Sequence, residues 1–296
     1  MLSKLLTKCL PILNTSTSVD EHHAYQESKM TIVAMLGLGE AGAIYARGLR
    51  DAGYEVAGYD PFTTIDEPGI RQEKQLSAAL EGAELVVSLV GARAASGVAG
   101  EAFARLTAGT VYADLNTGSP ALKEQLEHEA SARGVLLADV AVLAPVPRSG
   151  VRTPLMVSGP GAARFGELIQ AAGTPVDVVG GKAGEAAGRK LLRSVFMKGL
   201  AAVVIESVGA AALAGAEAWL RDQIAAELAG DAHALIQRLI DGSSLHAARR
   251  AHEVADAKEY LEELGQPTWM SAATIQWFDE LLGRANAAHT SEGARA

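Results

Sequence analysis

The fold of this chain is decided by the stretch Thr31-Ile-Val-Ala-Met-Leu-Gly-Leu-Gly-Glu-Ala-Gly-Ala-Ile-Tyr-Ala-Arg-Gly-Leu-Arg50. Its first six residues are almost all apolar, which is typical of a strand that is buried on both faces of a sheet. Gly37, Gly39 and Gly42 then form the pattern G-x-G-x-x-G, after which apolar residues continue at helical spacing. A strand, a glycine turn and a helix in this order predict a dinucleotide-binding unit.

Each glycine has a physical role in such a unit. Gly37 permits the tight turn, Gly39 lets backbone N–H groups approach a pyrophosphate, and Gly42 lets the helix pack closely on the strand. The N-terminus of the helix presents a partial positive charge to the anion. The alternative is a glycine-rich turn in some other α/β protein, which the flanking strands disfavour. The residues of the turn that we expect to bind the cofactor are Gly37, Leu38, Gly39, Glu40, Ala41 and Gly42.

A second predicted strand, Tyr54-Glu-Val-Ala-Gly-Tyr59, ends at Asp60. A carboxylate at this place accepts hydrogen bonds from the ribose 2′-OH of NAD and repels the additional phosphate of NADP. The following residues, Pro61-Phe-Thr-Thr64, supply no arginine to neutralise that phosphate. We therefore expect NAD as the preferred cofactor, with NADP as the alternative if Arg71 folds back toward the site.

Composition bounds the class of protein. The 296 residues are enough for two domains, and 49% of them are apolar while 21% are charged. No run approaches 18 uncharged apolar residues, so we expect a cytoplasmic protein without a membrane span. The net charge of −9 disfavours nucleic-acid binding, which needs clustered Lys and Arg. The single cysteine, Cys9, rules out an intramolecular disulfide and fits a reducing compartment.

From Met30 onward, strands and helices alternate, whereas residues 1–29 are expected to be a disordered extension. Repeated βα units predict an α/β fold with a Rossmann-like, doubly wound and mainly parallel sheet over residues 30–183. The further expected strands are Leu85–Val90, Thr110–Asp114, Val135–Asp139, Leu155–Ser158 and Val176–Val179.

After Gly184 the pattern changes to helices only. A helix is expected over Glu185 to about Leu213, apolar over much of its circumference. Such a helix is usually buried between domains or in a dimer interface, so we expect a homodimer. Residues 184–287 are predicted to form an all-helical C-terminal domain for substrate binding and dimerisation, and residues 288–296 a flexible tail.

Three further motifs follow the glycine turn: Asp114-Leu-Asn-Thr-Gly-Ser-Pro120, Asp139-Val-Ala-Val, and Gly184-Glu-Ala-Ala-Gly-Arg-Lys190. With these motifs the chain resembles the β-hydroxyacid dehydrogenase superfamily over about residues 30–282. This group includes the 3-hydroxyisobutyrate and 6-phosphogluconate dehydrogenases, with imine reductases as relatives. The resemblance implies a catalytic lysine at Lys190.

The chain also departs from that superfamily. Leu143-Ala-Pro145 stands where members have Ser-Gly-Gly, whose hydroxyl and backbone hold the substrate carboxylate. Arg193 and Ser194 stand where members have two asparagines. The segment from Lys190 to Gly199 resembles a less characterised branch with its own helical C-terminal domain.

Oxidation of an alcohol by hydride transfer requires a group that takes the hydroxyl proton. A lysine whose pKa is lowered by burial or by a cationic neighbour can do this, which makes Lys190 the candidate general acid/base. Arg193 can pair with a carboxylate or phosphate through two parallel hydrogen bonds, and Ser194 can bind the reacting oxygen. The alternative is that Lys190 and Arg193 belong to a solvated basic face.

Residues at the ends of two predicted strands complete the candidate site. Thr117 and Gly118 are expected to bind substrate, and Val90 to contact the cofactor, because ligands of open α/β sheets lie at the carboxyl ends of the strands. Ser119 has a second interpretation as a helix cap before Pro120. No metal site is expected, and Trp269 is expected to pack in a core.

The sequence thus predicts an NAD-dependent dehydrogenase for a small hydroxy acid, with decarboxylation left open. One alternative is an imine reductase or a dehydrogenase for a bulkier alcohol, which the missing Ser-Gly-Gly favours. Another alternative is a non-catalytic protein that senses a dinucleotide and controls a partner.

Overall fold

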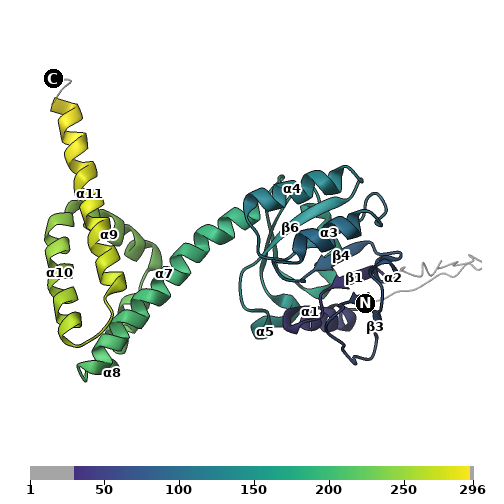
Figure 1. Cartoon of the computed structure of the whole chain (residues 1–296), viewed down its shortest axis with the longest axis horizontal. Helices are drawn as coiled ribbons and strands as arrows, with labels where there is room; N and C mark the ends of the chain where they lie inside the picture. Colours follow the sequence, from purple (N-terminus) through teal and green to yellow (C-terminus); the bar gives the residue numbers. More distant parts are fainter. Residues whose placement is uncertain (1–29, 294–296) are drawn as a thin grey trace, which may run out of the picture.

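The computed structural model describes residues 30–293, so the extension expected at residues 1–29 lies outside the described part. A compact part built on a sheet and a cluster of helices lie at opposite ends of one long helix (Figure 1). The two ends of the described chain therefore lie far apart, at the sheet and at the far helical cluster.

The sheet has eight strands in the order β3-β2-β1-β4-β5-β6-β7-β8. Every neighbouring pair is parallel except β6 and β7, which are antiparallel. This topology confirms the predicted doubly wound, mainly parallel sheet. The strands are β1 Ile32–Leu36, β2 Glu55–Tyr59, β3 Ile70–Glu73, β4 Leu85–Ser88, β5 Val111–Asp114, β6 Leu136–Val142, β7 Leu155–Ser158 and β8 Val176–Gly180.

The sequence predicted all of these strands except β3. Its residues, Ile70-Arg-Gln-Glu73, include a single apolar side chain, so no run of buried residues marks them. The strand lies at the edge of the sheet, where it pairs with β2 on one side only. An edge strand needs less apolar surface than a central one, and hydropathy alone does not reveal it.

Helices cover both faces of the sheet. Residues of α1 and α6 share one apolar core with the sheet, and residues of α2, α3 and α4 share another on the opposite face. The helices are α1 Glu40–Asp51, α2 Leu76–Leu80, α3 Ala95–Phe103, α4 Pro120–Ser131, α5 Val146–Ser149 and α6 Ala162–Ile169, with short 3₁₀ turns at Gly150–Arg152 and Gln170–Ala172.

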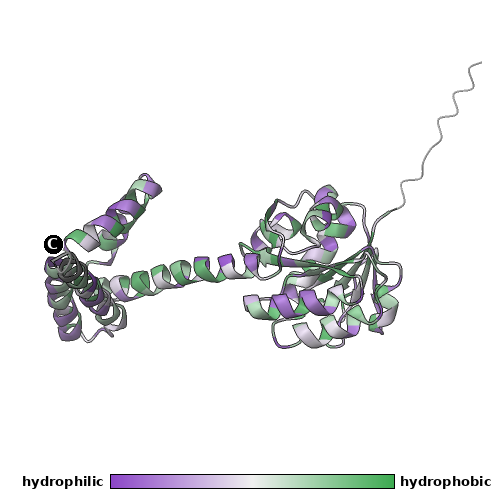
Figure 2. Cartoon of the chain, turned by 90° about the horizontal axis from the view of Figure 1, so that it is seen from above, coloured by the Kyte–Doolittle hydropathy of each residue, from purple (hydrophilic) through white to green (hydrophobic). Residues whose placement is uncertain are grey.

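The long helix α7 spans Glu185–Leu213, the range that the sequence predicted. Its 18-residue apolar window has a mean hydropathy of 1.7, so by length and composition alone it is long enough to cross a membrane. Only 17% of that window is buried within the chain. Figure 2 shows this helix, largely apolar in colour, running between the two parts. The chain by itself therefore leaves much of an apolar helix uncovered.

Beyond α7 the described residues form helices and turns only. They are α8 Glu217–Leu228, α9 Ala232–Leu245, α10 Ala247–Glu263 and α11 Trp269–Gly293, so part of the tail expected at residues 288–296 continues α11. Glu206 of α7 links that helix to the start of α11. Its carboxylate accepts hydrogen bonds from Met270 N–H at 2.6 Å, Ser271 N–H at 2.8 Å and Ser271 Oγ at 2.6 Å. An acid from one helix thus caps the first turn of another.

Large apolar side chains on the surface gather in the helical part of the molecule. All but three of the large exposed hydrophobic residues lie beyond Lys190, among them Leu192, Val195 and Phe196 on α7. The expectation that Trp269 packs in a core is wrong for the single chain, because its side chain is 80% exposed. Solvent exposure on this scale is typical of a surface that another molecule covers.

Candidate active site

The glycine turn adopts the geometry that its three glycines permit. Gly37 has φ +89°, and a Cβ atom there would lie 2.5 Å from the carbonyl oxygen of Leu89. A Cβ at Gly42 would collide with the carbonyl of Gly37, so only glycine lets α1 pack this closely on the turn. At Gly39, by contrast, a Cβ would meet no atom within 4 Å. The space beside Gly39 is therefore open to a ligand.

This open space fits the pyrophosphate of a dinucleotide. Glu40 and Ala41 are the first residues of α1, whose leading N–H groups have no partner within the helix. Leu38 plays a different part, because its side chain is buried and its N–H donates to Asp60 Oδ2 at 2.8 Å. Val90 lies beside the turn, since a Cβ at Gly37 would also be 3.0 Å from its backbone nitrogen. These cofactor candidates thus converge on the carboxyl ends of β1 and β4.

Asp60 follows β2 and fixes the loop after it, while its other carboxylate oxygen lies beside the glycine turn. Its Oδ1 accepts hydrogen bonds from Phe62 N–H at 2.8 Å and Thr63 N–H at 3.0 Å. Each carboxylate oxygen has two lone pairs, so Oδ2 can accept a ribose hydroxyl beside its bond to Leu38. Arg71 does not reach this place, because its guanidinium pairs with Glu73 at 3.1 Å and Glu55 at 3.9 Å.

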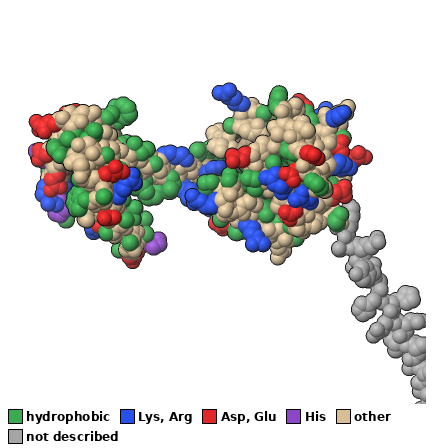
Figure 3. All heavy atoms as spheres, turned by 90° about the horizontal axis from the view of Figure 1, so that it is seen from below, with side chains coloured by type: hydrophobic (Ala, Val, Ile, Leu, Met, Phe, Trp, Pro, Cys, Tyr) green, Lys and Arg blue, Asp and Glu red, His purple; other side chains and the backbone are tan. Residues whose placement is uncertain are grey.

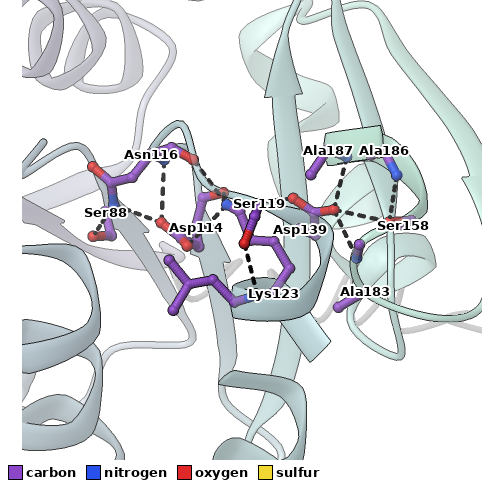
Figure 4. A network of polar contacts seen from close by, with 12 residues as sticks. Ser88, Asp114, Asn116, Ser119, Lys123, Asp139, Ser158, Ala183, Ala186 and Ala187 are labelled. Atoms are coloured by element: carbon purple, nitrogen blue, oxygen red, sulfur yellow. Dashed lines mark hydrogen bonds and ion pairs between the residues drawn. The ribbon is translucent and has the colours of Figure 1, made fainter. Parts of the chain in front are cut away.

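One carboxylate joins the sheet to the long helix. Asp139, at the inner part of β6, accepts hydrogen bonds through Oδ2 from Gly184 N–H and Ala187 N–H, both at 3.0 Å. Ser158 Oγ of β7 donates to the same oxygen at 3.2 Å and accepts from Ala186 N–H at 3.0 Å. The first turn of α7 is therefore capped by side chains of two strands, as Figure 4 shows.

Lys190 follows one helical turn after this cap and is half-buried. It shares a small cavity of about 10 Å³ with Thr117 and Gly118. No salt bridge involves its ammonium among the described residues. Burial lowers the pKa of Lys190, and the nearby positive charge of Lys123 lowers it further, while Asp139 opposes the change. A lysine in this state is suited to proton transfer nearer neutral pH than an exposed lysine.

The other α7 candidates lie beside this cavity without lining it. Arg193 is exposed and Ser194 is half-buried, one turn beyond Lys190. Neither belongs to the cavity that brings Lys190, Thr117 and Gly118 together.

Ser119 is explained by local structure. Its Oγ accepts a 3.2 Å hydrogen bond from Leu122 N–H, and Pro120 begins α4. The helix-cap interpretation is therefore the one that the structure confirms. Thr117 and Gly118, which precede this cap, lie at the carboxyl end of β5.

The sequence interpretation missed Lys123, which lies under the candidate site. Its ammonium donates to Asp114 Oδ2 at 2.9 Å and to the carbonyl oxygens of Asp114 and Asn116 at 3.0 and 2.9 Å. Asn116 in turn accepts from Gly91 N–H at 2.8 Å, so the network joins the ends of β4 and β5 (Figure 4). A signal was present: Lys123 lies three residues before Leu126, on the apolar face of a predicted helix.

Two of the larger cavities in the described part of the chain lie elsewhere. One of about 820 Å³ is lined by residues 81–84 and 107–110, which precede β4 and β5. It therefore lies at the amino ends of the strands, whereas ligands of open α/β sheets bind at the carboxyl ends. The other, of about 670 Å³, is lined mainly by apolar residues of α7, α8, α10 and α11. Within residues 30–293, no group of three His, Cys, Asp or Glu residues is placed to hold a metal ion.

Two parts of the sequence match known protein families. Residues 32–180 match the family described as the NAD binding domain of 6-phosphogluconate dehydrogenase. The chain belongs to this family. Residues 211–281 match a second family, described as a domain of unknown function. The predicted resemblance to the β-hydroxyacid dehydrogenase superfamily is thereby confirmed, as is a dinucleotide-binding dehydrogenase fold.

Relatives of this family are similar over different lengths. A conserved hypothetical protein from Sinorhizobium meliloti is 29% identical, with a TM-score of 0.57 over 86% of this chain and 90% of that one. A conserved protein of unknown function, described as structurally similar to 3-hydroxyacid dehydrogenases, is 26% identical, with a TM-score of 0.56 over 84% of this chain and 96% of that one. An uncharacterised 28.5 kDa protein from Methanothermus fervidus is 29% identical over 42% of this chain; the match spans about half of that relative's length.

Reductive aminases share the fold at lower identity. A reductive aminase from Aspergillus terreus, solved with NADPH, is 17% identical, with a TM-score of 0.73 over 86% of this chain and 94% of that one. At this identity the likeness concerns the fold alone. The family membership and the site together support a dinucleotide-dependent oxidoreductase that acts on a small molecule.

Proposed function

We propose that this chain is a dehydrogenase that oxidises the CH–OH group of a small β-hydroxy acid with NAD, with Lys190 as the general acid/base. The observation that carries the proposal is the place of Lys190. It lies half-buried beside Thr117 and Gly118, at the carboxyl ends of the strands, with no ion-pair partner among the described residues. The proposed domain boundaries are residues 30–183 for the dinucleotide and residues 184–287 for substrate binding and dimerisation.

The proton chemistry follows from the lowered pKa of Lys190. Burial and the neighbouring Lys123 favour its neutral amine, which can accept the proton of the substrate hydroxyl. In this proposal Thr117, which lines the cavity, and Ser194, one turn beyond Lys190, orient that hydroxyl by hydrogen bonds. Bound NAD would supply the acceptor for the hydride that leaves the carbon bearing this hydroxyl. The products would be a β-keto acid, NADH and one proton, which Lys190 would hold before it passes to solvent.

The charge around Lys190 favours an acidic substrate. Arg189, Lys190, Arg193 and Lys198 lie within ten residues of α7, and none has a carboxylate within 4 Å in the described part of the chain. Figure 3 shows Lys and Arg side chains at the narrow neck where α7 leaves the sheet. Arg193 can form two parallel hydrogen bonds with a carboxylate, which replaces the Ser-Gly-Gly contact that this chain lacks.

Asp60 supports NAD over NADP. Its carboxylate lies at the end of β2 beside the glycine turn, and Arg71 is engaged by Glu55 and Glu73. A second phosphate on the ribose would meet this negative charge with no arginine to offset it. The Asp60→Ala variant should therefore bind NADP relatively better than the wild type does.

The exposed apolar face of α7 supports a homodimer. Leu192, Val195 and Phe196 are 74%, 75% and 61% exposed on the same helix as Lys190 and Arg193. A second copy that covers this face would also close the outer side of the candidate site. A protein partner fits better than a membrane, because the buried Glu206 of α7 is engaged by α11, and we propose a cytoplasmic dimer.

Light scattering tests the dimer. The double variant Leu192→Glu/Val195→Glu should shift the mass in solution from two chains to one. Val178→Glu is a matched control, because Val178 is 51% exposed on β8 and does not belong to the apolar face of α7. A wild-type mass of one chain would contradict the dimer.

Thermal unfolding with NAD, NADH, NADP and NADPH in parallel tests the cofactor. A nucleotide at 100 times its dissociation constant should stabilise the fold by about 2.7 kcal/mol. We expect the response to NAD and NADH to exceed that to the phosphorylated pair. No response to any of the four would contradict the oxidoreductase proposal.

A panel of small β-hydroxy acids with their amides then tests the substrate class. We expect turnover with the acids, loss of turnover in Lys190→Met, and retained turnover in the control Lys182→Met. Analysis of the product for carbon dioxide shows whether decarboxylation follows. Cofactor binding without turnover of any compound would favour the non-catalytic sensing function.

An imine reductase is the second candidate, and Leu143-Ala-Pro145 favours it. These residues follow β6 in place of a carboxylate-binding Ser-Gly-Gly. A panel of cyclic imines with NADPH would show reduction under this alternative. Strict dependence of turnover on a substrate carboxylate would exclude it.

A further inference from the structure

Lys123 is a fully enclosed cation beneath the candidate site. Its side chain is 1% exposed, and it lies on α4 with its ammonium against Asp114 at the end of β5 and Asp139 in the middle of β6. The three hydrogens of that ammonium have three acceptors, Asp114 Oδ2, Asp114 O and Asn116 O, at 2.9 to 3.0 Å. With every hydrogen engaged, Lys123 has none to give to a substrate.

The hydrogen bond to Asn116 O fixes the loop that faces the substrate. Asn116 is buried and precedes Thr117 and Gly118, which line the cavity beside Lys190. The side chain of Asn116 is also held, because it donates to Ser88 Oγ at 2.9 Å and accepts from Gly91 N–H at 2.8 Å. Lys123 therefore fixes the backbone of residues 116–118 through its hydrogen bond to Asn116 O.

The same small cavity brings the two lysines together. Lys123, Asp139 and Lys190 all line it, with a volume of about 10 Å³. Asp139 Oδ1 lies 3.3 Å from Lys123 Nζ and is buried without a hydrogen-bond partner among residues 30–293, while Oδ2 accepts hydrogen bonds from α7. The cavity has room for about one water molecule, which could bridge Asp139 Oδ1 and the Lys190 amine.

We propose that Lys123 is a positioning residue for Lys190. Lys123 holds the loop 116–118 in place and puts a buried positive charge under the Lys190 amine. This inference rests on the proposed role of Lys190 as acid/base. Lys123 acts on the site through other residues, because all three hydrogens of its ammonium are already donated to Asp114 and Asn116.

The charges around Lys190 agree with this assignment. Burial contributes most to its lowered pKa, and the Lys123 charge from α4 is the next cause. Asp139 of β6 and Asp114 of β5 act in the opposite direction, and Lys198 of α7 itself acts in the same direction as Lys123. Among the charged neighbours, Lys123 therefore has the largest effect, because Asp139 and Asp114 follow it in order of size.

Nuclear magnetic resonance of the lysine side chains tests the proposal without cofactor or substrate. The full chain is labelled with ¹³C and ¹⁵N in lysine, the Lys190 signal is assigned by its absence in Lys190→Met, and its titration is followed with pH. In the wild type we expect a midpoint below the ordinary value for lysine. In Lys123→Met the midpoint should rise by about one pH unit, as expected for the loss of a neighbouring charge at an intermediate effective dielectric.

A second variant guards against misfolding. Lys123→Met leaves Asp114 without its partner, so Lys123→Met/Asp114→Asn removes one charge of each sign. The Lys190 midpoint should still rise, by less than in the single variant, because Lys123 has the larger effect of the two. Lys182→Met, an exposed lysine just before α7, is the control and should leave the midpoint unchanged.

An unchanged Lys190 midpoint in either folded Lys123 variant would overturn the proposal. So would a wild-type midpoint at the ordinary value for lysine. If the midpoint moves as expected but no hydroxy acid is turned over, the proposed function fails and the electrostatic role of Lys123 stands.

Discussion

The carboxylate of Asp139 accepts a 3.0 Å hydrogen bond from the N–H group of Ala187, which couples the strand β6 to the first turn of α7. Lys190 follows Ala187 by three residues, so it lies about one helical turn further along the same helix. Asp139 therefore contributes, together with Ser158, to the direction in which α7 leaves the sheet and to the place of the proposed base.

Replacement of Asp139 should destabilise the fold. Asp139→Ala removes the acceptor for Gly184 and Ala187 N–H and leaves Lys123 with one carboxylate fewer. Breaking such a buried pair costs about 3–5 kcal/mol, which urea unfolding followed by circular dichroism measures. Asp177→Ala, at an exposed position on β8, is the control and should change stability by about 0.5 kcal/mol or less. Equal losses in the two variants would contradict the coupling.

The glycines of the turn should respond differently to alanine. Gly37→Ala places a Cβ 2.5 Å from Leu89 O at φ +89°, so we expect a loss of about 1–3 kcal/mol in unfolding free energy. Gly39→Ala puts its methyl group in open space and should leave the stability of the ligand-free chain nearly unchanged. It should nevertheless abolish the thermal stabilisation by NAD, because the methyl group occupies the place of the pyrophosphate. Retained NAD binding in Gly39→Ala would show that the dinucleotide lies elsewhere.

Glu206 should make the helical cluster sensitive to acid. Burial alone would raise the pKa of Glu206, but the hydrogen bonds from Ser271 and Met270 together lower it. A carboxyl group whose pKa is lower in the folded state adds stability above its unfolded pKa, and this stability is lost as pH falls through the folded pKa. Glu206→Gln should cost about 1–3 kcal/mol at neutral pH and much less in acid. Thermal unfolding from pH 7 down to about pH 3 measures both; a loss independent of pH would contradict the cap.

The lowered pKa of Lys190 should appear in the rate of oxidation. The neutral amine is the form that accepts the hydroxyl proton, so the rate should increase with pH and level off above the Lys190 pKa. Because that pKa is lowered, the plateau should begin below the ordinary value for lysine. A pH profile of kcat/KM for oxidation measures this, with Lys182→Met as the control that should leave the profile unchanged. Since Lys198 also lowers the Lys190 pKa, Lys198→Met should shift the profile to higher pH. An unshifted profile would contradict the assignment of Lys190 as the base.

The order of elements was largely readable from local patterns. Buried parallel strands are apolar along their whole length, which makes them visible in the sequence. The glycine pattern after β1 predicted the turn at which we propose that the cofactor binds. The range of α7 was also predicted, because no glycine-rich turn or proline interrupts it. The edge strand β3 was missed because it has only one apolar residue. The antiparallel direction of β7 could not be predicted, because it depends on how β7 pairs with β6 in the folded sheet.

The amino-acid sequence by itself determined the βα alternation of the sheet, the glycine turn and the long helix, because each depends on residues that are neighbours in the chain. Lys190 as the candidate base came from the resemblance of the sequence motifs to a known superfamily. Only the tertiary structure decided that Lys123 lies under Lys190, that Asp139 caps α7, and that Trp269 is exposed. Hydropathy along a chain describes one helix or strand at a time. Which charges meet inside the fold, and which apolar faces stay uncovered, depends on how β5, β6, α4 and α7 pack together.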